Sequence, residues 1–184
     1  MQQTHDYETL FSYVMEKTNN RQMTEEEYRY VASFLGDKNF LVFGTGYDSD
    51  LWRRANKNGL TFFLENNKQW ITNYKDTFVV NYNTKRTQAK KLLREYNKGD
   101  TEKLEIELPE QIKNISWDII FVDSPEGHSK TTPGRMQSIY MARRLSQNHT
   151  EILIHDCNRF VEDRYSKAMF KEIKMFTKLR HCRL

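Results

Sequence analysis

The sequence has few of the residues on which several protein classes depend. Its 184 residues include only two cysteines, three prolines and seven glycines. The two cysteines, Cys157 and Cys182, show no metal-type pairing and do not force a disulfide. No base that would make Cys157 a nucleophile is evident, so we expect an inert thiol there. The chain also contains no internal repeat and no low-complexity segment.

Long hydrophobic runs are also missing. A membrane-spanning helix needs about 20 mainly apolar residues, and no segment approaches that length. The first residues are polar and show no signal peptide. Hydrophobic residues make up 38% of the chain, and the mean hydropathy is -0.85. We therefore expect a soluble chain without a membrane segment, either cytoplasmic or cut from a larger protein, and its oligomeric state is left open.

The charge balance is mildly basic. The formal net charge is +4 and the pI is near 8.9, which favours an acidic glycan, a phosphate or a nucleic acid as partner. Lysines and arginines are scattered, apart from Lys90-Lys91 and Arg143-Arg144, and no known nucleic-acid-binding motif is present. We therefore expect no nucleic-acid partner.

Short apolar runs alternate with segments of helical periodicity. Strands are predicted at 40–43, 60–65, 77–82, 117–123 and 151–156, with a further strand at 178–184. Helices are predicted within 1–22 and at 24–35, 50–56, 68–74, 85–96, 135–145 and 162–176, whereas 101–114 is expected to be a surface strand or loop. The alternation predicts an α/β fold with a mostly parallel central sheet and helices on both faces. We expect a single domain, 1–184, with residues 1–37 as an N-terminal helical lead-in.

The sequence after the first predicted strand is typical of a nucleotide-binding turn. The apolar run ends at Gly44-Thr45-Gly46, where glycine allows a sharp turn and the close approach of a ligand. Glu65 ends the second strand about 20 residues later, the usual distance to an acid that binds ribose hydroxyls. The third glycine of the dinucleotide motif is absent, because Ser49 stands in its place. Two interpretations of this stretch remain: it binds a nucleotide-type ligand, or it is a strand-turn-helix unit with a packing role alone.

Every one of the five predicted strands ends in a residue able to bind a ligand. The ends are Gly44-Thr45-Gly46, Glu65, Tyr82-Asn83, Asp123 and His155-Asp156. Because parallel strands place their carboxyl ends along one edge of the sheet, we expect these residues to converge on one site.

Carboxylates and imidazoles dominate the last part of this edge. Asp123 is followed by Glu126 and His128, and His155-Asp156 ends the next strand. Carboxylates and imidazole bind Mg²⁺, Mn²⁺, Co²⁺ or Zn²⁺, so Asp123, His155 and Asp156 are candidate metal ligands. A cation there would orient a hydroxyl and lower its pKa. Alternatively, Glu126 or His128 acts as a general base without metal, or the aspartates only cap loops and helices.

The sequence also predicts where three other side chains lie. Arg135 is predicted in the first turn of a helix, where its charge opposes the helix dipole. It is therefore expected to be held for an anionic substrate or for Glu126, with a solvated arginine as the alternative. Trp52 and Trp70 are expected in the core rather than in the wall of a ligand site.

A series of motifs extends in order over most of the chain. They are Gln22-Met23-Thr24, Asn39 to Ser49 followed by Leu51-Trp52, Thr61 to Trp70, Tyr82 to Lys85, Trp117 to Gly127, Pro133 to Met136, and the group His155-Asp156, Arg159, Val161-Glu162 and Tyr165-Ser166. Together they resemble the plant glucuronoxylan 4-O-methyltransferase family, which includes irregular-xylem and arabinogalactan methyltransferase relatives. Thr45, Tyr47 and His128 depart from the residues that this family more often has, and its membrane anchor is missing.

The resemblance implies a Rossmann-like class I methyltransferase. The implied activity is an S-adenosyl-L-methionine-dependent O-methyltransferase that acts on a sugar hydroxyl of a glycan, either a uronic acid such as glucuronic acid or a deoxyhexose such as rhamnose. A divalent cation (Mg, Mn or Co) is implied as well, and the plant relatives are Golgi proteins.

The resemblance also assigns roles to residues in the matching motifs. Gly44, Gly46 and Asp48 would hold the methionine end of the cofactor, Glu65 would hold the ribose, and Asp123 would lie beside the transferring methyl group. The other candidate cofactor-binding residues are Thr45, Ser49, Tyr82 and Asn83, and the candidate catalytic residues are Asp123, Glu126 and His128.

Two other functions compete with methyl transfer. An NAD-dependent oxidoreductase would use a similar sheet, but the third glycine is missing and no Ser-Tyr-Lys-type catalytic set is apparent. A non-catalytic glycan-binding module could retain the same fold. Beside Glu65, Asp123 and His155-Asp156, the missing glycine favours a methyl-donor site over a dinucleotide site.

Overall fold

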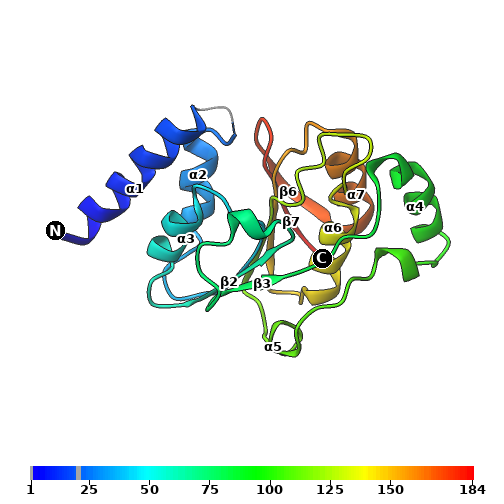
Figure 1. Cartoon of the computed structure of the whole chain (residues 1–184), viewed down its shortest axis with the longest axis horizontal. Helices are drawn as coiled ribbons and strands as arrows, with labels where there is room; N and C mark the ends of the chain where they lie inside the picture. The colour runs from blue at the N-terminus through cyan, green and yellow to red at the C-terminus, as the bar shows by residue number, and fades with distance from the viewer. Residues whose placement is uncertain (1, 20–21) are drawn as a thin grey trace.

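A seven-stranded sheet runs through the middle of the protein (Figure 1). The computed structural model describes residues 2–19 and 22–184, with side chains from Tyr7 onward. The strand order is β3-β2-β1-β4-β5-β7-β6. The strands are β1 (Asn39–Phe43), β2 (Leu60–Glu65), β3 (Thr77–Val79), β4 (Ile119–Val122), β5 (Glu151–Ile154), β6 (Lys171–Met175) and β7 (Arg180–Arg183). The first five strands pair in parallel, whereas β7 is antiparallel to both β5 and β6.

Helices cover both faces of this sheet (Figure 1). One face carries α1 (Gln2–Thr18), α2 (Glu25–Ala32) and α3 (Ser49–Ala55), and the other carries α4 (Ala89–Tyr96), α6 (Met136–Leu145) and α7 (Phe160–Met169). The connections include the short helical turns η1 (Lys68–Trp70), η2 (Arg86–Gln88), η3 (Glu102–Leu104) and α5 (Glu110–Lys113). Within residues 2–19 and 22–184, no helix has the length and apolar character needed to cross a bilayer.

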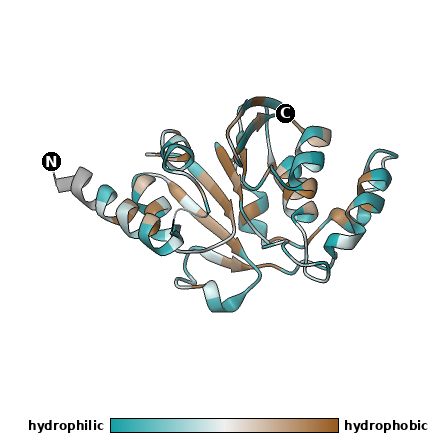
Figure 2. Ribbon diagram, turned by 90° about the horizontal axis from the view of Figure 1, so that it is seen from above, coloured by the Kyte–Doolittle hydropathy of each residue, from teal (hydrophilic) through white to brown (hydrophobic). Residues whose placement is uncertain are grey.

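Each face of the sheet has its own hydrophobic core, because neighbouring residues of a strand point to opposite sides. Leu41 and Phe43 of β1 pack on the α4, α6 and α7 side, whereas Phe40 and Val42 pack on the α1 to α3 side. All four are buried. A central strand that buries both faces must be apolar along its whole length, which explains the continuous run. Figure 2 shows the hydrophobic residues gathered along the strands and the hydrophilic ones on the outer helices.

The register of β1 with its neighbours fixes where the strands end. Phe43 lies opposite Leu64 of β2 and Val122 of β4. The backbone N–H of Gly44 donates to Leu64 O at 2.8 Å, and that of Asp123 donates to Phe43 O at 2.9 Å. The hydrogen-bond ladder therefore extends just past the strands, and the loops after β1, β2 and β4 begin side by side.

The C-terminal part differs from the predicted helix over 162–176. α7 ends at Met169, and Lys171–Met175 forms the edge strand β6 instead. Lysine, glutamate and methionine are good helix formers, but pairing with β7 gives this segment backbone partners along its length. Tertiary pairing thus overrides the local preference. The strand predicted at 178–184 is present as β7.

Three connections are also shorter or more helical than expected. The strand predicted at 77–82 extends only over Thr77–Val79, because it is an edge strand that pairs with three residues of β2. The helix predicted at 68–74 is a single 3-10 turn. Residues 101–114 contain the helical turns η3 and α5 and no strand.

One buried carboxylate joins α2 to the turn between β6 and β7. Thr24 caps α2 in a capping box with Glu27. Glu27 Oε2 accepts from Thr24 N at 2.8 Å, and Oε1 accepts from Lys178 N at 2.8 Å and Leu179 N at 3.0 Å. Burial alone would raise the pKa of Glu27, but these N–H groups hold it below its ordinary value. The start of α2 and the turn before β7 are therefore fixed to each other.

Candidate active site

A cavity of about 780 Å³ opens at the carboxyl ends of the parallel strands. Its size lies in the range of small-molecule and cofactor sites. The loops after β1, β2, β4 and β5 build its wall. Ten residues singled out from the sequence line it: Gly44, Thr45, Gly46, Asp48, Glu65, Asp123, Glu126, His128, His155 and Asp156. The strand ends therefore gather around one hollow, although they differ in what each contributes.

The glycine loop after β1 passes very close to the loop after β4. Gly44 has a φ of 122°, and a Cβ added there would lie 2.9 Å from Ser124 Cβ. Only glycine combines this conformation with this approach. The loop then turns into α3, where Ser49 Oγ accepts from Gly46 N at 2.9 Å. Ser49 is buried and does not line the cavity, so it shapes the loop from behind.

Glu65 ties the loop after β2 to the glycine loop. Its Oε2 accepts from Thr45 N at 2.9 Å and from Thr45 Oγ1 at 3.1 Å. Its Oε1 accepts from Asn67 N at 2.6 Å. Glu65 is 4% exposed yet lines the cavity. The carboxylate is thus held firmly at the cavity wall.

Asp48 brings a second carboxyl group to the glycine loop. It is half-buried and lines the cavity at the start of α3. Burial and the negative charge of Asp123 raise the pKa of Asp48 to about 7. This carboxyl group therefore changes its charge near neutral pH.

An aromatic pair lies at the rim beside these loops. The rings of Tyr47 and Trp70 meet edge to face, with their centroids 5.5 Å apart, and both residues line the cavity. Trp70 is 38% exposed, so its predicted place in the core is wrong, whereas Trp52 is fully buried as predicted. The reason is the short 3-10 turn after β2, which ends at Trp70 and leaves it without a covering element.

Tyr82 and Asn83 are not among the residues that line this cavity. They follow β3, but the backbone N–H of Asn83 donates to Gln137 Oε1 at 3.0 Å, and Asn83 Oδ1 accepts from Gln137 Nε2 at 2.7 Å. Tyr82 packs against the core on the α6 side, where burial raises the pKa of its hydroxyl. Asn83, after β3, therefore contacts α6, whereas residues at the other four predicted strand ends line the cavity.

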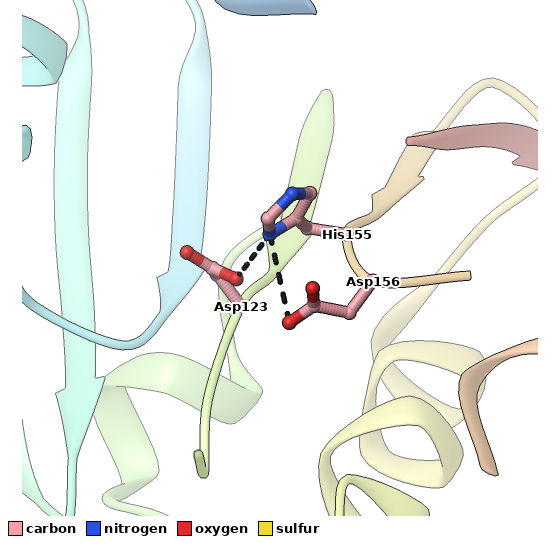
Figure 3. Close-up of side chains that lie close together, drawn as sticks. All are labelled: Asp123, His155 and Asp156. Carbon is pink, nitrogen blue, oxygen red and sulfur yellow. Dashed lines mark hydrogen bonds and ion pairs between the residues drawn. The ribbon is translucent and has the colours of Figure 1, made fainter. Parts of the chain in front are cut away.

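Asp123, His155 and Asp156 form a compact cluster at the ends of β4 and β5 (Figure 3). His155 Nδ1 lies 2.9 Å from Asp123 Oδ1 and 3.8 Å from Asp156 Oδ2. One donor atom of each residue lies within 4.8 Å of the other two. Asp156 has a φ of 62°, a left-handed conformation that aspartate adopts more readily than most residues. Its carboxylate points toward His155 (Figure 3).

Arg135 is part of the same cluster. It is 3% exposed, so the alternative of a solvated arginine is wrong. Its Nη2 lies 3.0 Å from Asp123 Oδ1 and 2.9 Å from Asp156 Oδ2. Its Nε donates to Pro125 O at 3.0 Å, and its Nη1 donates to His155 O at 2.9 Å. The guanidinium is therefore held by the protein's own carboxylates and carbonyls.

The ionisable side chains of the cluster shift one another's pKa values. Burial alone would raise the pKa of Asp123, but His155 and Arg135 hold it below its ordinary value. Burial alone would lower the pKa of His155, but the carboxylate of Asp123 raises it above its ordinary value. Burial raises the pKa of Glu162, whose Oε1 lies 3.8 Å from Arg135 Nε. Asp123 is therefore an anion that two cationic neighbours stabilise.

Glu126 and His128 form a second pair at the open side of the cavity. His128 Nδ1 lies 3.0 Å from Glu126 Oε2, and both side chains are largely exposed. Gly127 between them has a φ of 63°, in the region that favours glycine. Arg159 Nη1 donates to Glu126 O at 2.9 Å and also lies 3.0 Å from Asp156 Oδ2. This loop therefore presents an accessible imidazole with a carboxylate that orients it.

Some residues of the cavity were not foreseen. Gln22 and Lys178 line it from the segments before α2 and β7, and Lys178 Nζ donates to Gln22 O at 3.0 Å. Their position depends on the β6–β7 hairpin, which the sequence pattern did not reveal. Asn66 and Asn67 also line the cavity. These two directly follow Glu65 and could have been found from that adjacency.

The sequence is similar to proteins of known family. A family model described as IRX15/IRX15L/GXM matches residues 27–180. The chain is 36% identical to glucuronoxylan 4-O-methyltransferase 1 of Arabidopsis thaliana over 177 residues, which cover 82% of this chain and 62% of that protein. It is 35% identical to arabinogalactan O-methyltransferase 1 of Arabidopsis thaliana over 159 residues, 72% of this chain and 55% of that protein. The chain thus spans less than two thirds of the length of either relative.

A comparison with solved structures concerns the fold. A candidate caffeoyl-CoA O-methyltransferase from Staphylococcus aureus superposes with a TM-score of 0.51 at 13% sequence identity, over 97% of this chain and 92% of that one. The architecture is that of the Rossmann-like class I methyltransferases, with a mostly parallel central sheet and helices on both faces, as predicted.

Proposed function

The chain belongs to the IRX15/IRX15L/GXM family, and on this basis we propose that it is an S-adenosyl-L-methionine-dependent O-methyltransferase that acts on a sugar hydroxyl of a glycan. The observation that carries the proposal is a single cavity lined both by the glycine loop with Glu65 and by the Glu126–His128 pair. We assign the glycine loop and Glu65 to the cofactor end, and Glu126 with His128 to the acceptor end. The relatives named for glucuronoxylan and arabinogalactan support a glycan acceptor.

The cofactor end is built from the loops after β1 and β2. Gly44 and Gly46 leave the backbone open to close approach by the methionine part, and Asp48 offers a carboxylate to its cationic groups. Glu65 would bind the ribose hydroxyls, with Thr45 holding its carboxylate in place. When bound, S-adenosylmethionine supplies an electrophilic methyl group. The protein has to align an acceptor hydroxyl with that methyl group and remove the hydroxyl proton.

The acceptor end offers a base for that proton. Transfer of the methyl group from sulfur to the acceptor oxygen would release the hydroxyl proton, which the imidazole of His128 would accept. Glu126 lies 3.0 Å from His128 Nδ1 and orients the ring. Asp123 lies at the end of β4, next to the glycine loop, and its carboxylate stabilises positive charge near the reacting carbon.

The acceptor end also carries positive charge. Arg159 lines the cavity, where it contacts Glu126 O and Asp156 Oδ2, and its side chain is 42% exposed. A guanidinium in that position favours an anionic sugar, because it can pair with a carboxylate. We therefore rank a uronic acid such as glucuronic acid above a neutral deoxyhexose such as rhamnose.

The divalent cation implied by the resemblance fits this structure poorly. The chemistry of Asp123, His155 and Asp156 suits Mg²⁺, Mn²⁺ or Co²⁺, and their donor atoms are close enough together. However, Arg135 Nη2 already lies at hydrogen-bond distance from both aspartates. A cation that used those oxygens would have to displace a buried guanidinium. We therefore assign no catalytic step to a metal.

The test is transfer of a radiolabelled methyl group to a panel of glycans with uronic acid and deoxyhexose acceptors. We expect incorporation into the uronic acid acceptor above a heat-inactivated control. Titration calorimetry with S-adenosylhomocysteine and with NAD accompanies the assay. Tight binding of NAD without binding of S-adenosylhomocysteine would overturn the proposal in favour of an oxidoreductase, and binding of glycans without any transfer would favour a non-catalytic module.

A further inference from the structure

The guanidinium of Arg135 fills the centre of the acidic cluster. A single nitrogen, Nη2, lies about equally far from Asp123 Oδ1 and Asp156 Oδ2, at 3.0 and 2.9 Å. That is the bridging position that a cation shared by two carboxylates takes. The side chain is 4% exposed, so water does not screen these contacts.

Two backbone carbonyls keep the guanidinium in that position. Nε donates to Pro125 O at 3.0 Å, and Nη1 donates to His155 O at 2.9 Å. These carbonyls belong to the loops that carry Asp123 and Asp156. Arg135 therefore joins the ends of β4 and β5, and moving it away would break four buried contacts at once.

The charges of the cluster are balanced without any added ion. Asp123, Asp156 and Glu162 face Arg135, with Arg159 and His155 as further cationic groups. A divalent cation would enter a site whose carboxylates already have positive partners, so its attraction to them is largely cancelled.

We propose that Arg135 is the built-in cation of this site: its guanidinium holds Asp123 and Asp156 in the place where a divalent metal would otherwise bind. Arg135 is thus a positioning residue, which acts through the two aspartates. The wild-type protein then needs no metal to arrange this edge of the cavity. Loss of the guanidinium frees the two carboxylates next to the His155 imidazole, and the three side chains form a donor set suited to Mn²⁺ or Co²⁺.

The test measures metal binding directly, by electron paramagnetic resonance titration with Mn²⁺ and by calorimetry with Co²⁺. We expect no saturable binding to the wild-type protein at up to millimolar metal. Arg135→Met, which removes the charge but keeps a long side chain, is expected to bind one Mn²⁺ per chain at least tenfold more tightly than the wild type. Arg135→Lys keeps a cation and is expected to stay without a site.

Arg159→Met is the matched control. It also removes a positive partner of Asp156, but from an exposed side chain, and it leaves Arg135 in place. We expect this variant to bind no more Mn²⁺ than the wild type. A gain of binding in Arg159→Met equal to that in Arg135→Met would overturn the proposal, because any loss of charge would then suffice.

The wild-type measurements decide the proposal even if Arg135→Met does not fold. Saturable binding of one Mn²⁺ or Co²⁺ per chain that Asp123→Asn abolishes would overturn it. Loss of S-adenosylhomocysteine binding on treatment with a chelator, restored by Mn²⁺, would do the same. These readouts do not require methyl transfer, so failure of this proposal is distinguishable from failure of the proposed function.

Discussion

Glu27 gives the sharpest test of how the fold supports the cavity. Its carboxylate is fully buried and accepts three backbone N–H groups, from Thr24, Lys178 and Leu179. Glu27→Ala removes both carboxylate oxygens and with them all three hydrogen bonds. Hydrogen bonds to charged groups contribute about 1.5–3 kcal/mol each, and water can reach Thr24 and Lys178 after the truncation, so we take the lower end. The expected loss is about 4.5 kcal/mol.

That loss is measurable by thermal and urea unfolding. In a protein of this size, 1 kcal/mol shifts the melting temperature by about 2–4 °C, so Glu27→Ala is expected to melt about 9–18 °C lower. Glu27→Gln keeps a carbonyl oxygen for Lys178 and Leu179 and loses chiefly the bond from Thr24. Its cost should be about 1–2 kcal/mol. Glu26→Ala, at the exposed neighbour in the same helical turn, should change stability by less than about 0.5 kcal/mol.

The same contacts predict a pH dependence. The pKa of Glu27 is lowered in the folded protein, so its contribution is fully present above the unfolded value of about 4.3 and is lost as the pH falls through the folded value. The difference in stability between wild type and Glu27→Gln should therefore shrink in acid. Equal losses for Glu27→Gln and Glu27→Ala, or a loss below about 1 kcal/mol for Glu27→Ala, would refute this reasoning.

Three further predictions concern the cavity. The amide of Glu65→Gln can accept from Thr45 or from Asn67 but not from both. Calorimetry should therefore show that S-adenosylhomocysteine binds about 5–150-fold more weakly, a cost of about 1–3 kcal/mol. Unchanged affinity would argue against the role of Glu65. Because the pKa of Asp48 is raised to about 7, that affinity should rise with pH through 7, and Asp48→Asn should flatten the profile. His128→Gln should lower kcat by roughly 100-fold or more with little change in the KM for the acceptor; a wild-type rate would remove the imidazole from the mechanism.

The strand ends that build the cavity could be predicted because the signal is local. A buried parallel strand must be apolar along its length, so the run before Gly44 marks where β1 stops. The same holds for the runs before Glu65, Asp123 and His155. Topology then brings these ends together, since parallel strands share one carboxyl edge.

The parts that escaped prediction depend on partners distant in sequence. A lone arginine at a helix start is usually solvated, and Arg135 is buried only because carbonyls and carboxylates from two other loops surround it. Trp70 was expected in the core, but it ends a short turn and lies 38% exposed at the rim of the cavity beside Tyr47. The strand β6 has the composition of a helix, and only its pairing with β7 makes it a strand.

The three tryptophans differ in burial, so the intrinsic fluorescence of the exposed one can report on the cavity. Trp52 and Trp117 are fully buried, whereas Trp70 lies at the rim of the cavity and is 38% exposed. Collisional quenchers such as acrylamide should therefore reach Trp70 first, and its fluorescence should respond when a ligand enters beside it. Titrations followed by intrinsic emission then need no label, and Trp70→Phe supplies the blank.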